Sequence, residues 1–204
     1  MITTTKTYAQ TNAIARSPTL QTVLMVEKFI DEHSGEYKKT ELFNNLPKKV
    51  MWQTFQVIIE YLERTYRIII EKDGKVTYIW NPEFYNQVKN RPEIKLWPSP
   101  SKIKFVDAEL EQAFNELSDE DPIKKALILA FQNIREDFQA GEYIPKKDIP
   151  ESYLTKYGIN NIRVYDLPYA WRLMYTITGS SEIGFISVVL DWMTHKDYEK
   201  LFGI

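Results

Sequence analysis

The first third of the chain places apolar residues at helical spacing. Three amphipathic helices are predicted there: one that opens at Ser17-Pro18 and ends at Gly35, one over 40–45 that stops before Pro47, and one over about 50–66. Their apolar residues are expected to share one core: Leu20, Val23, Leu24, Phe29, Ile30, Leu42, Phe43, Phe55, Ile58, Ile59 and Leu62. Residues 1–16 are polar and Thr-rich, and a poorly ordered tail is expected there.

The pattern then changes to β-rich runs. Residues 67–72 and 75–80 flank Asp73-Gly74. Asp-Gly between two such runs predicts a β-hairpin with a type I′ turn, because that turn needs a positive φ at both central positions. Three helices and a hairpin therefore form a predicted first domain over 17–81.

Residues 82–101 contain four prolines, Pro82, Pro92, Pro98 and Pro100. Proline fixes φ and lacks a backbone donor, so an irregular linker is predicted, with the domain boundary near residue 98. Two halves that fold separately, and proteolysis within this stretch, are the expected consequences.

A second pattern of elements runs from 102 to 204. It predicts a strand over 102–106, helices over 107–117 and 122–139, strands over 162–166, 171–178 and 183–192, and a last helix over 196–202. The expected fold class is α+β, with a small antiparallel sheet packed with helices in this second domain.

Composition narrows the chemistry. The 204 residues suit two domains, and the absence of cysteine excludes disulfides and thiolate metal sites. With only two histidines, and without a Walker loop, a dinucleotide fingerprint or a Gly-x-Ser-x-Gly motif, no metal and no cofactor is expected. The chain has no apolar run of membrane-spanning length and no signal-peptide pattern, so a cytoplasmic location is predicted.

The net charge of −2 is unevenly divided. Residues 1–100 hold 14 Lys and Arg against 11 Asp and Glu, whereas residues 101–204 hold 12 against 17. The basic half is the better candidate for contact with phosphates.

Residues 17–81 resemble winged helix-turn-helix DNA-binding domains. The segment 40–55 (TELFNNLPKKVMWQTF) is similar to their second helix, turn and start of the recognition helix, and 59–69 (IEYLERTYRII) to its end. The resemblance implies contact with duplex DNA, through the third helix in the major groove and the hairpin on the backbone. The candidate DNA-binding residues are Lys48, Lys49, Trp52, Gln53, Gln56, Lys72 and Lys75. A protein partner is the alternative, with Lys48 and Lys49 as a solvated helix start and Trp52 partly buried.

Residues 102–204 resemble the RelE/ParE toxin superfamily. Two segments carry the resemblance, 162–177 (IRVYDLPYAWRLMYTI) and 190–203 (LDWMTHKDYEKLFG). It implies a ribosome-dependent endoribonuclease in which the mRNA 2′-hydroxyl attacks the neighbouring phosphate without a metal, and an antitoxin protein as a partner. Such a reaction needs a base, an acid and a cation on the phosphorane.

The resemblance assigns roles by position. Arg172 is the candidate phosphate clamp, His195 and Tyr198 are the acid/base candidates, and Arg163 supplies a further cation. The candidate RNA-binding residues are Lys146, Lys147 and Lys196. Tyr165 departs from the family, since ribonuclease members often have a second basic residue there. Other readings stay open: Arg172 pairs with Asp166 or Asp191, His195 caps the last helix, and Tyr198 packs in the core.

Three functions remain. The first is a toxin-like ribonuclease fused to a DNA-binding domain. The second is a non-enzymatic DNA-binding transcription regulator whose toxin-like half is a dimerisation or partner-binding platform, with a homodimer as one form. The third is a protein-interaction module. A concave basic surface around Arg163 and Arg172 favours the first, and a neutral or buried surface there favours the second.

Overall fold

The structure is a computed structural model that describes residues 17–96, 102–180 and 184–204. The tail predicted over 1–16, the boundary predicted near residue 98 and the strand start predicted at Ile183 lie outside these residues. The fold class is α+β, as predicted. Among the described residues there are eight helices and seven strands, in a two-stranded and a five-stranded sheet.

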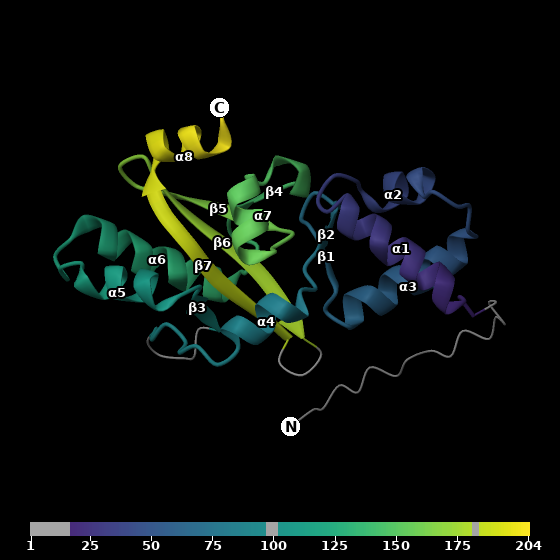
Figure 1. Ribbon diagram of the computed structural model, residues 1–204, viewed down its shortest axis with the longest axis horizontal. Helices are drawn as coiled ribbons and strands as arrows, with labels where there is room; N and C mark the ends of the chain where they lie inside the picture. Colours follow the sequence, from purple (N-terminus) through teal and green to yellow (C-terminus); the bar gives the residue numbers. More distant parts are fainter. Residues whose placement is uncertain (1–16, 97–101, 181–183) are drawn as a thin grey trace, which may run out of the picture.

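Three helices and a hairpin form the first part of the molecule (Figure 1). They are α1 (Leu20–Glu32), α2 (Lys39–Asn45), α3 (Trp52–Arg64), β1 (Ile68–Ile70) and β2 (Val76–Tyr78). The predicted stripe on α3 is confirmed, because Phe55, Ile58, Ile59 and Leu62 are all buried in one cluster with the α1 and hairpin side chains.

The start of α1 differs from the prediction. The N-cap is Thr19, whose hydroxyl accepts a hydrogen bond from the Thr22 amide at 3.3 Å, so the helix begins two residues beyond Pro18. Only some of the α1 residues that were predicted to face the core do so: Ile30 is buried, but Leu20 and Leu24 are exposed. Helical spacing defines a stripe but not which edge of it meets the core.

The hairpin is confirmed, but its turn is not of the predicted type. Only Gly74 has a positive φ, at 88°, and Asp73 does not. The amide of Glu71 donates to the Lys75 carbonyl at 2.8 Å, so the loop contains residues 72–74 rather than two residues. A three-residue loop does not require a positive φ at Asp73.

The five-stranded sheet forms the centre of the second part. Its order is β3 (Ile103–Phe105), β7 (Gly184–Thr194), β6 (Trp171–Ser180), β5 (Ile162–Leu167) and β4 (Glu142–Ile144). The β3–β7 pair is parallel and the other three pairs are antiparallel, so the sheet is not purely antiparallel as predicted. The short strand β4 was not predicted.

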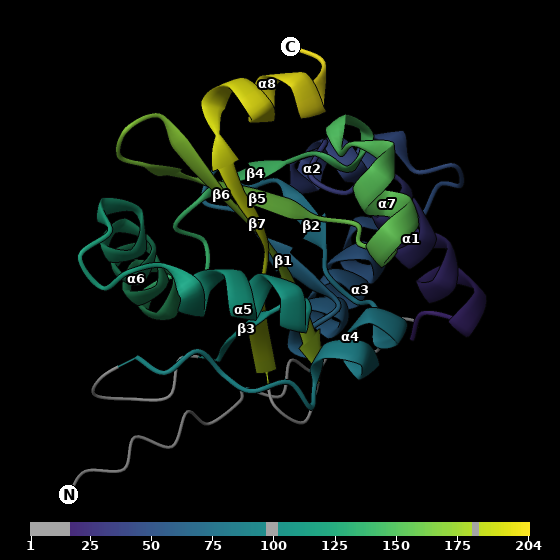
Figure 2. The ribbon, with the colours of Figure 1, turned by 60° about the vertical axis from the view of Figure 1, so that its left-hand side comes forward.

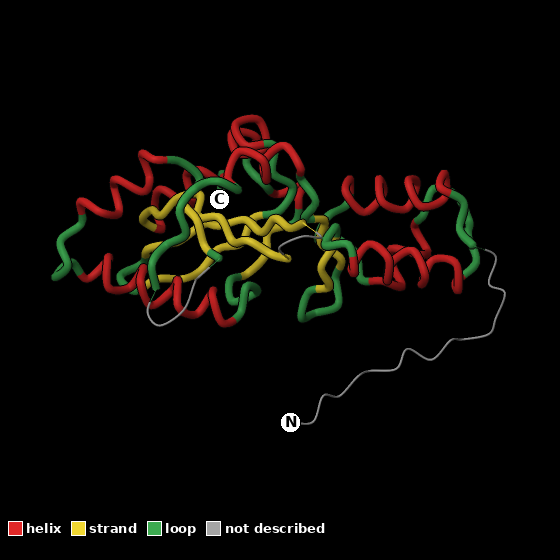
Figure 3. Tube along the Cα trace, turned by 90° about the horizontal axis from the view of Figure 1, so that it is seen from below, coloured by secondary structure: helices red, strands yellow, loops and turns green. Residues whose placement is uncertain are grey.

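Helices cover both faces of this sheet (Figure 3). On one face, α5 (Ala108–Glu116) and α6 (Pro122–Glu136) pack through Phe114, Leu127 and Phe131. On the other lie α4 (Pro82–Val88), α7 (Glu151–Tyr157) and α8 (His195–Phe202), with a 3₁₀ turn, η1 (Lys146–Asp148), before α7. The strand residues alternate between the two cores, with Leu173 and Tyr175 in the first and Met174 in the second.

The predicted linker is wrong for its described part. Residues 82–88 form α4, because Pro82 occupies the first turn, where no amide donor is needed, and the Asn81 side chain accepts from the Phe84 amide at 3.0 Å. Phe84 and Val88 are buried against the sheet, and the Ile94 amide donates to the Ile103 carbonyl at 2.8 Å. Proline here starts a helix rather than disrupting structure.

The first half has its own buried cluster, but its hairpin also contributes to a core of the second half, and separate folding of the two halves stays a prediction. Ile69 of β1 and Ile79 belong to the same buried cluster as Leu173 and Tyr175 of β6. Polar contacts cross the junction as well: the Asn161 side-chain amide donates to the Tyr78 carbonyl at 3.4 Å, and the Gln139 side-chain amide to the Ile70 carbonyl at 3.0 Å. The hairpin (β1 and β2 in Figure 2) therefore packs both against the helices of the first half and against the second half.

Candidate functional site

Two connections meet at one end of the five-stranded sheet, the β5–β6 turn and the β7–α8 junction. The His195 amide donates to the Ala170 carbonyl at 2.7 Å, and Trp171 pairs with Thr194. Tyr169 and Ala170 have φ values of 60° and 56°, which non-glycine residues seldom adopt. Strain of this kind costs about 1–3 kcal/mol per residue and is held only by surrounding contacts.

Arg172 lies beside this turn and is paired. It stands directly opposite Asp166 in the β5–β6 ladder, with 3.2 Å between its Nε and the carboxylate Oδ1. One of its terminal amino groups donates to the Trp171 carbonyl at 3.2 Å. The Arg172 side chain is 20% exposed and that of Asp166 is 78% exposed. The predicted alternative, an ion pair with Asp166, is thus confirmed.

His195 is the first residue of α8. Its Nε2 lies 3.3 Å from the Glu199 carboxylate, and its Nδ1 is buried without a hydrogen-bond partner among the described residues. The helix is capped by Thr194, whose hydroxyl accepts from the Asp197 amide at 3.2 Å. The reading of His195 as the cap of this helix is therefore wrong.

Tyr198 joins this group from the next turn of α8. Its ring centroid is 6.4 Å from that of His195 and 4.3 Å from that of Phe202. Burial raises the pKa of the Tyr198 hydroxyl, which also lies near the charges of Glu142, Arg172 and Asp166. At neutral pH the phenol is protonated, so it can donate a hydrogen bond or a proton but cannot act as a base.

Arg163 does not lie with Arg172, His195 and Tyr198, which corrects the prediction that it supplies a cation for catalysis. Its side chain is 3% exposed, and it donates to the Glu71 carboxylate and, at 2.7 Å, to the Gly141 carbonyl. Glu71 comes from the hairpin loop of the first half. The Arg163 guanidinium is therefore neutralised inside the junction between the halves.

The length of the β5–β6 turn explains this separation. Residues 168–170 form a three-residue loop, so Arg163 pairs with Tyr175 and Arg172 pairs with Asp166. This register puts the two arginines on opposite faces of the sheet; a two-residue turn would put them on the same face. Residues 168–170 contain no glycine that would indicate the turn length, so this register could not be predicted from the sequence.

The predicted RNA-binding lysines do not converge. Lys146 lies 2.8 Å from Asp31 of α1, so its ammonium is held at the junction between the halves, and its assignment to RNA stays a prediction. Lys147 is exposed on η1, and Lys196 is exposed on α8 next to His195. Only Lys196 therefore adjoins the group formed by Arg172, His195 and Tyr198.

The predicted DNA-binding residues of α3 gather at its N-terminal end. Lys48, Lys49, Gln53 and Gln56 are exposed, and neither lysine forms an ion pair with a described residue. Trp52 is half-buried, as the alternative reading expected, with its ring 4.9 Å from that of Phe43.

The predicted wing is not free. Lys72 forms an ion pair with Asp137, and Lys75 lies over the Tyr143 ring at 5.3 Å. The Tyr143 hydroxyl donates to Asp73 at 2.9 Å. The hairpin loop is therefore packed against β4 and the segment before it, and the assignment of Lys72 and Lys75 to DNA stays a prediction.

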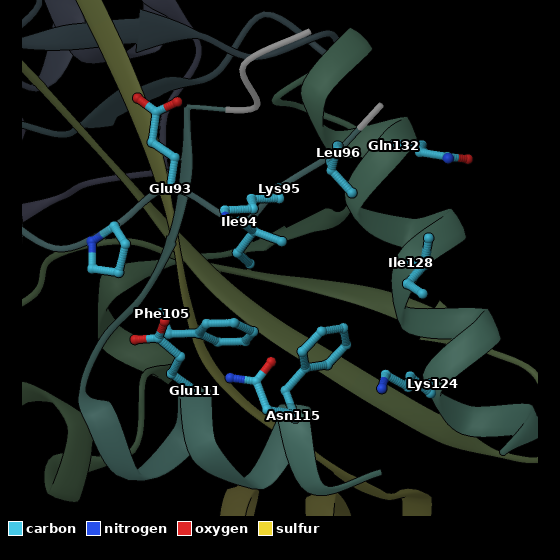
Figure 4. Close-up of a pocket in the computed structure, with 12 residues that line it drawn as sticks. Glu93, Ile94, Lys95, Leu96, Phe105, Glu111, Asn115, Lys124, Ile128 and Gln132 are labelled. Carbon is cyan, nitrogen blue, oxygen red and sulfur yellow. The ribbon is translucent and has the colours of Figure 1, made fainter. Parts of the chain in front are cut away.

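A cavity of about 640 Å³ lies between residues 92–96 and the helices α5 and α6 (Figure 4). Phe105, Phe114 and Ile128 contribute apolar walls, and Glu111 and Lys124 contribute charges. This cavity is lined by none of the predicted site residues. The Lys124 ammonium is bound to the Leu117 carbonyl at 2.8 Å and to Asp119 at 2.7 Å, so it is not directed at a ligand.

The described residues contain neither a candidate metal site nor a candidate membrane-spanning helix. No group of three or more histidines and carboxylates is placed to hold a metal ion within 17–96, 102–180 and 184–204. In the same ranges, no helix has the length and apolar character needed to cross a membrane.

Comparison with known proteins gives no match: no protein-family model, no curated protein and no solved structure matches the chain.

Proposed function

We propose that the chain is a DNA-binding regulator, in which the N-terminal end of α3 contacts duplex DNA and the second half is a partner-binding platform rather than a nuclease. The observation that carries this proposal is the exposed, unpaired state of Lys48 and Lys49 within the described residues. Lys147 and Lys196 are also exposed without an ion pair to a described residue, but only Lys48 and Lys49 have the exposed glutamines Gln53 and Gln56 beside them.

The chemistry of this end suits a major groove. Ammonium groups neutralise phosphates, and a glutamine amide can donate to and accept from one adenine edge. Gln53 and Gln56 lie one turn apart on the exposed side of α3, whose opposite side is fixed by Phe55 and Leu62 in the core. The resemblance of 17–81 to winged-helix domains supports the same surface.

Within the described residues, the two arginines on which a nuclease function would depend are both paired with carboxylates. Arg163 is buried against Glu71, and Arg172 is paired with Asp166. Glu142 and Glu199 add negative charge around Tyr198 and His195. A phosphate approaching Arg172 would have to displace a carboxylate and pass others, which disfavours binding of RNA.

RNA cleavage is the second candidate, because Arg172, His195 and Tyr198 lie at the same end of the sheet. In that reaction the 2′-oxygen gives its proton to a base, for which His195 is the candidate, and attacks phosphorus; the bond to the 5′-oxygen breaks, and the leaving oxygen takes a proton. Tyr198, protonated at neutral pH, could supply that proton, and Arg172 could stabilise the phosphorane after release from Asp166. The resemblance of 102–204 to RelE/ParE toxins supports this candidate.

One pair of measurements on the full chain separates the candidates. Binding to a fluorescent DNA duplex at low salt and cleavage of mRNA on translating ribosomes are followed with the same preparation. The regulator proposal expects DNA binding without cleavage. Cleavage, or the absence of DNA binding, would count against it.

A further inference from the structure

The end of the molecule away from α5 and α6 carries an apolar surface that no described residue covers (Figure 1). Of nine large hydrophobic residues that are exposed in the described chain, four lie on α1 and α3: Leu20 at 72%, Leu24 at 53%, Val57 at 42% and Tyr61 at 40%. Contiguous exposed apolar residues mark interaction sites, whereas scattered ones do not.

A groove of about 490 Å³ runs between these helices. Val23 and Ile58 line it together with Leu20, Val57 and Tyr61. On α3, Val57, Glu60, Tyr61 and Arg64 follow one another at the i, i+3, i+4, i+7 spacing of a single stripe. We call Leu20, Leu24, Val57, Glu60, Tyr61 and Arg64 the α1/α3 face.

We propose that the α1/α3 face is the contact surface of a homodimer. A twofold interface brings a surface against its own copy, so each acid on it needs a base on the same surface. The face supplies one of each, Glu60 and Arg64, and neither forms an ion pair with a described residue. A crossing of the two α3 helices near Tyr61 places Glu60 of each copy beside Arg64 of the other.

This dimer does not depend on the proposed DNA binding. Lys48 and Lys49 precede the N-terminus of α3, whereas the stripe occupies its C-terminal half. The face also lies away from α8 and at the opposite end of the molecule from α6 (Figure 1). The groove is small, so a weak dimer is expected, with a Kd on the order of 10 µM.

Sedimentation velocity of the full chain at roughly 1–200 µM, a range that brackets such a Kd, tests the proposal. The mass should rise from 24.1 kDa toward twice that value. Leu20→Glu and Val57→Glu should abolish the rise. Leu129→Glu on α6 is the matched control, because Leu129 is equally apolar and 57% exposed outside the face, and it should leave the dimer unchanged.

Charge-reversal variants test whether the molecule that binds the α1/α3 face is a second copy of the chain. Glu60→Arg and Arg64→Glu should each weaken self-association by about tenfold or more, because like charges then meet. Mixing these two variants, or combining both changes in one chain, should restore dimerisation. A constant mass of 24.1 kDa at every concentration, or single charge variants that dimerise like the wild type, would overturn the proposal. Failure of the mixture to recover would do the same.

Discussion

Arg163 of β5 and Glu71 of the hairpin loop form a buried ion pair across the junction between the halves, with each side chain 3% exposed. Removal of one partner leaves the other charge buried and unpaired, which costs about 3–5 kcal/mol. Arg163→Ala is therefore expected to lower the free energy of unfolding by about that amount. Urea denaturation followed by circular dichroism measures the change.

Two controls define this test. Lys200→Ala removes an exposed cation outside the junction and should change stability by less than about 0.5 kcal/mol. Glu71→Leu with Arg163→Met replaces both charges by apolar groups and should recover most of the loss. If Arg163→Ala unfolds no more easily than Lys200→Ala, the ion pair does not join the halves as described.

The burial of hairpin residues in a core of the second half makes a second prediction. Because Ile69 and Ile79 are buried with Leu173 and Tyr175, the hairpin and the sheet should unfold together. Thermal or urea unfolding should show one cooperative transition with the same midpoint by tryptophan fluorescence and by circular dichroism. Two separate transitions would show that these contacts do not couple the halves.

Asp191 gives a prediction on pH. Burial raises the pKa of its carboxyl group in the folded state, although the Trp192 amide and the Tyr153 hydroxyl donate to it at 2.8 and 3.2 Å. Because the pKa of Asp191 is higher in the folded state than in the unfolded state, its protonated form stabilises the fold. This stabilisation is fully present at a pH below the unfolded-state pKa of about 3.8. It is lost as the pH rises through the folded-state pKa. The charged form is thus penalised near neutrality.

Asp191→Asn keeps an acceptor oxygen and removes that charge. The variant should be more stable than the wild type at pH 7, and its advantage should shrink as the pH falls below the folded pKa. Denaturation curves for both proteins at pH 7 and pH 4 give the comparison. A variant that is less stable at pH 7 would show that the carboxylate is needed in its charged form.

The pairing of Arg172 with Asp166 leads to the prediction on RNA. The wild type should not cleave mRNA on translating ribosomes, and Arg172→Ala should make no difference. If the wild type does cleave, the second candidate function replaces the regulator. Arg172→Ala should then abolish cleavage with an unchanged circular dichroism spectrum, because the phosphorane would lose its cation.

Sequence patterns predicted the α3 core stripe, the hairpin and most of the α6, β6 and α8 segments, since each of these elements has a strong local period. They could not predict α4, because Pro82 at a first helical turn and Pro82 in a linker look alike without the Asn81 cap and the sheet beneath. The short helix α7, over Glu151–Tyr157, was missed for lack of a clear stripe.

The site depended on features that are not local. Whether Arg163 and Arg172 share a face was decided by one residue of turn length, and the partner of Arg163 lies 92 positions away at Glu71. The proximity of Arg172, His195 and Tyr198 was expected from the family resemblance, but Asp166 and Glu142 come from strands whose register the sequence does not specify. Exposure of Leu20 and Leu24 could not be predicted because helical spacing does not determine which edge of the apolar stripe meets the core.

The salt dependence of duplex DNA binding tests the regulator proposal most directly. The full chain should bind at low salt, and Lys48→Ala with Lys49→Ala should weaken binding and lower the log–log salt slope by about two units, one for each phosphate contact. Lys156→Ala with Lys200→Ala removes the same charge from exposed positions of the second half and should leave the slope unchanged. No binding at low salt, or equal slopes for the two double variants, would contradict contact of α3 with DNA.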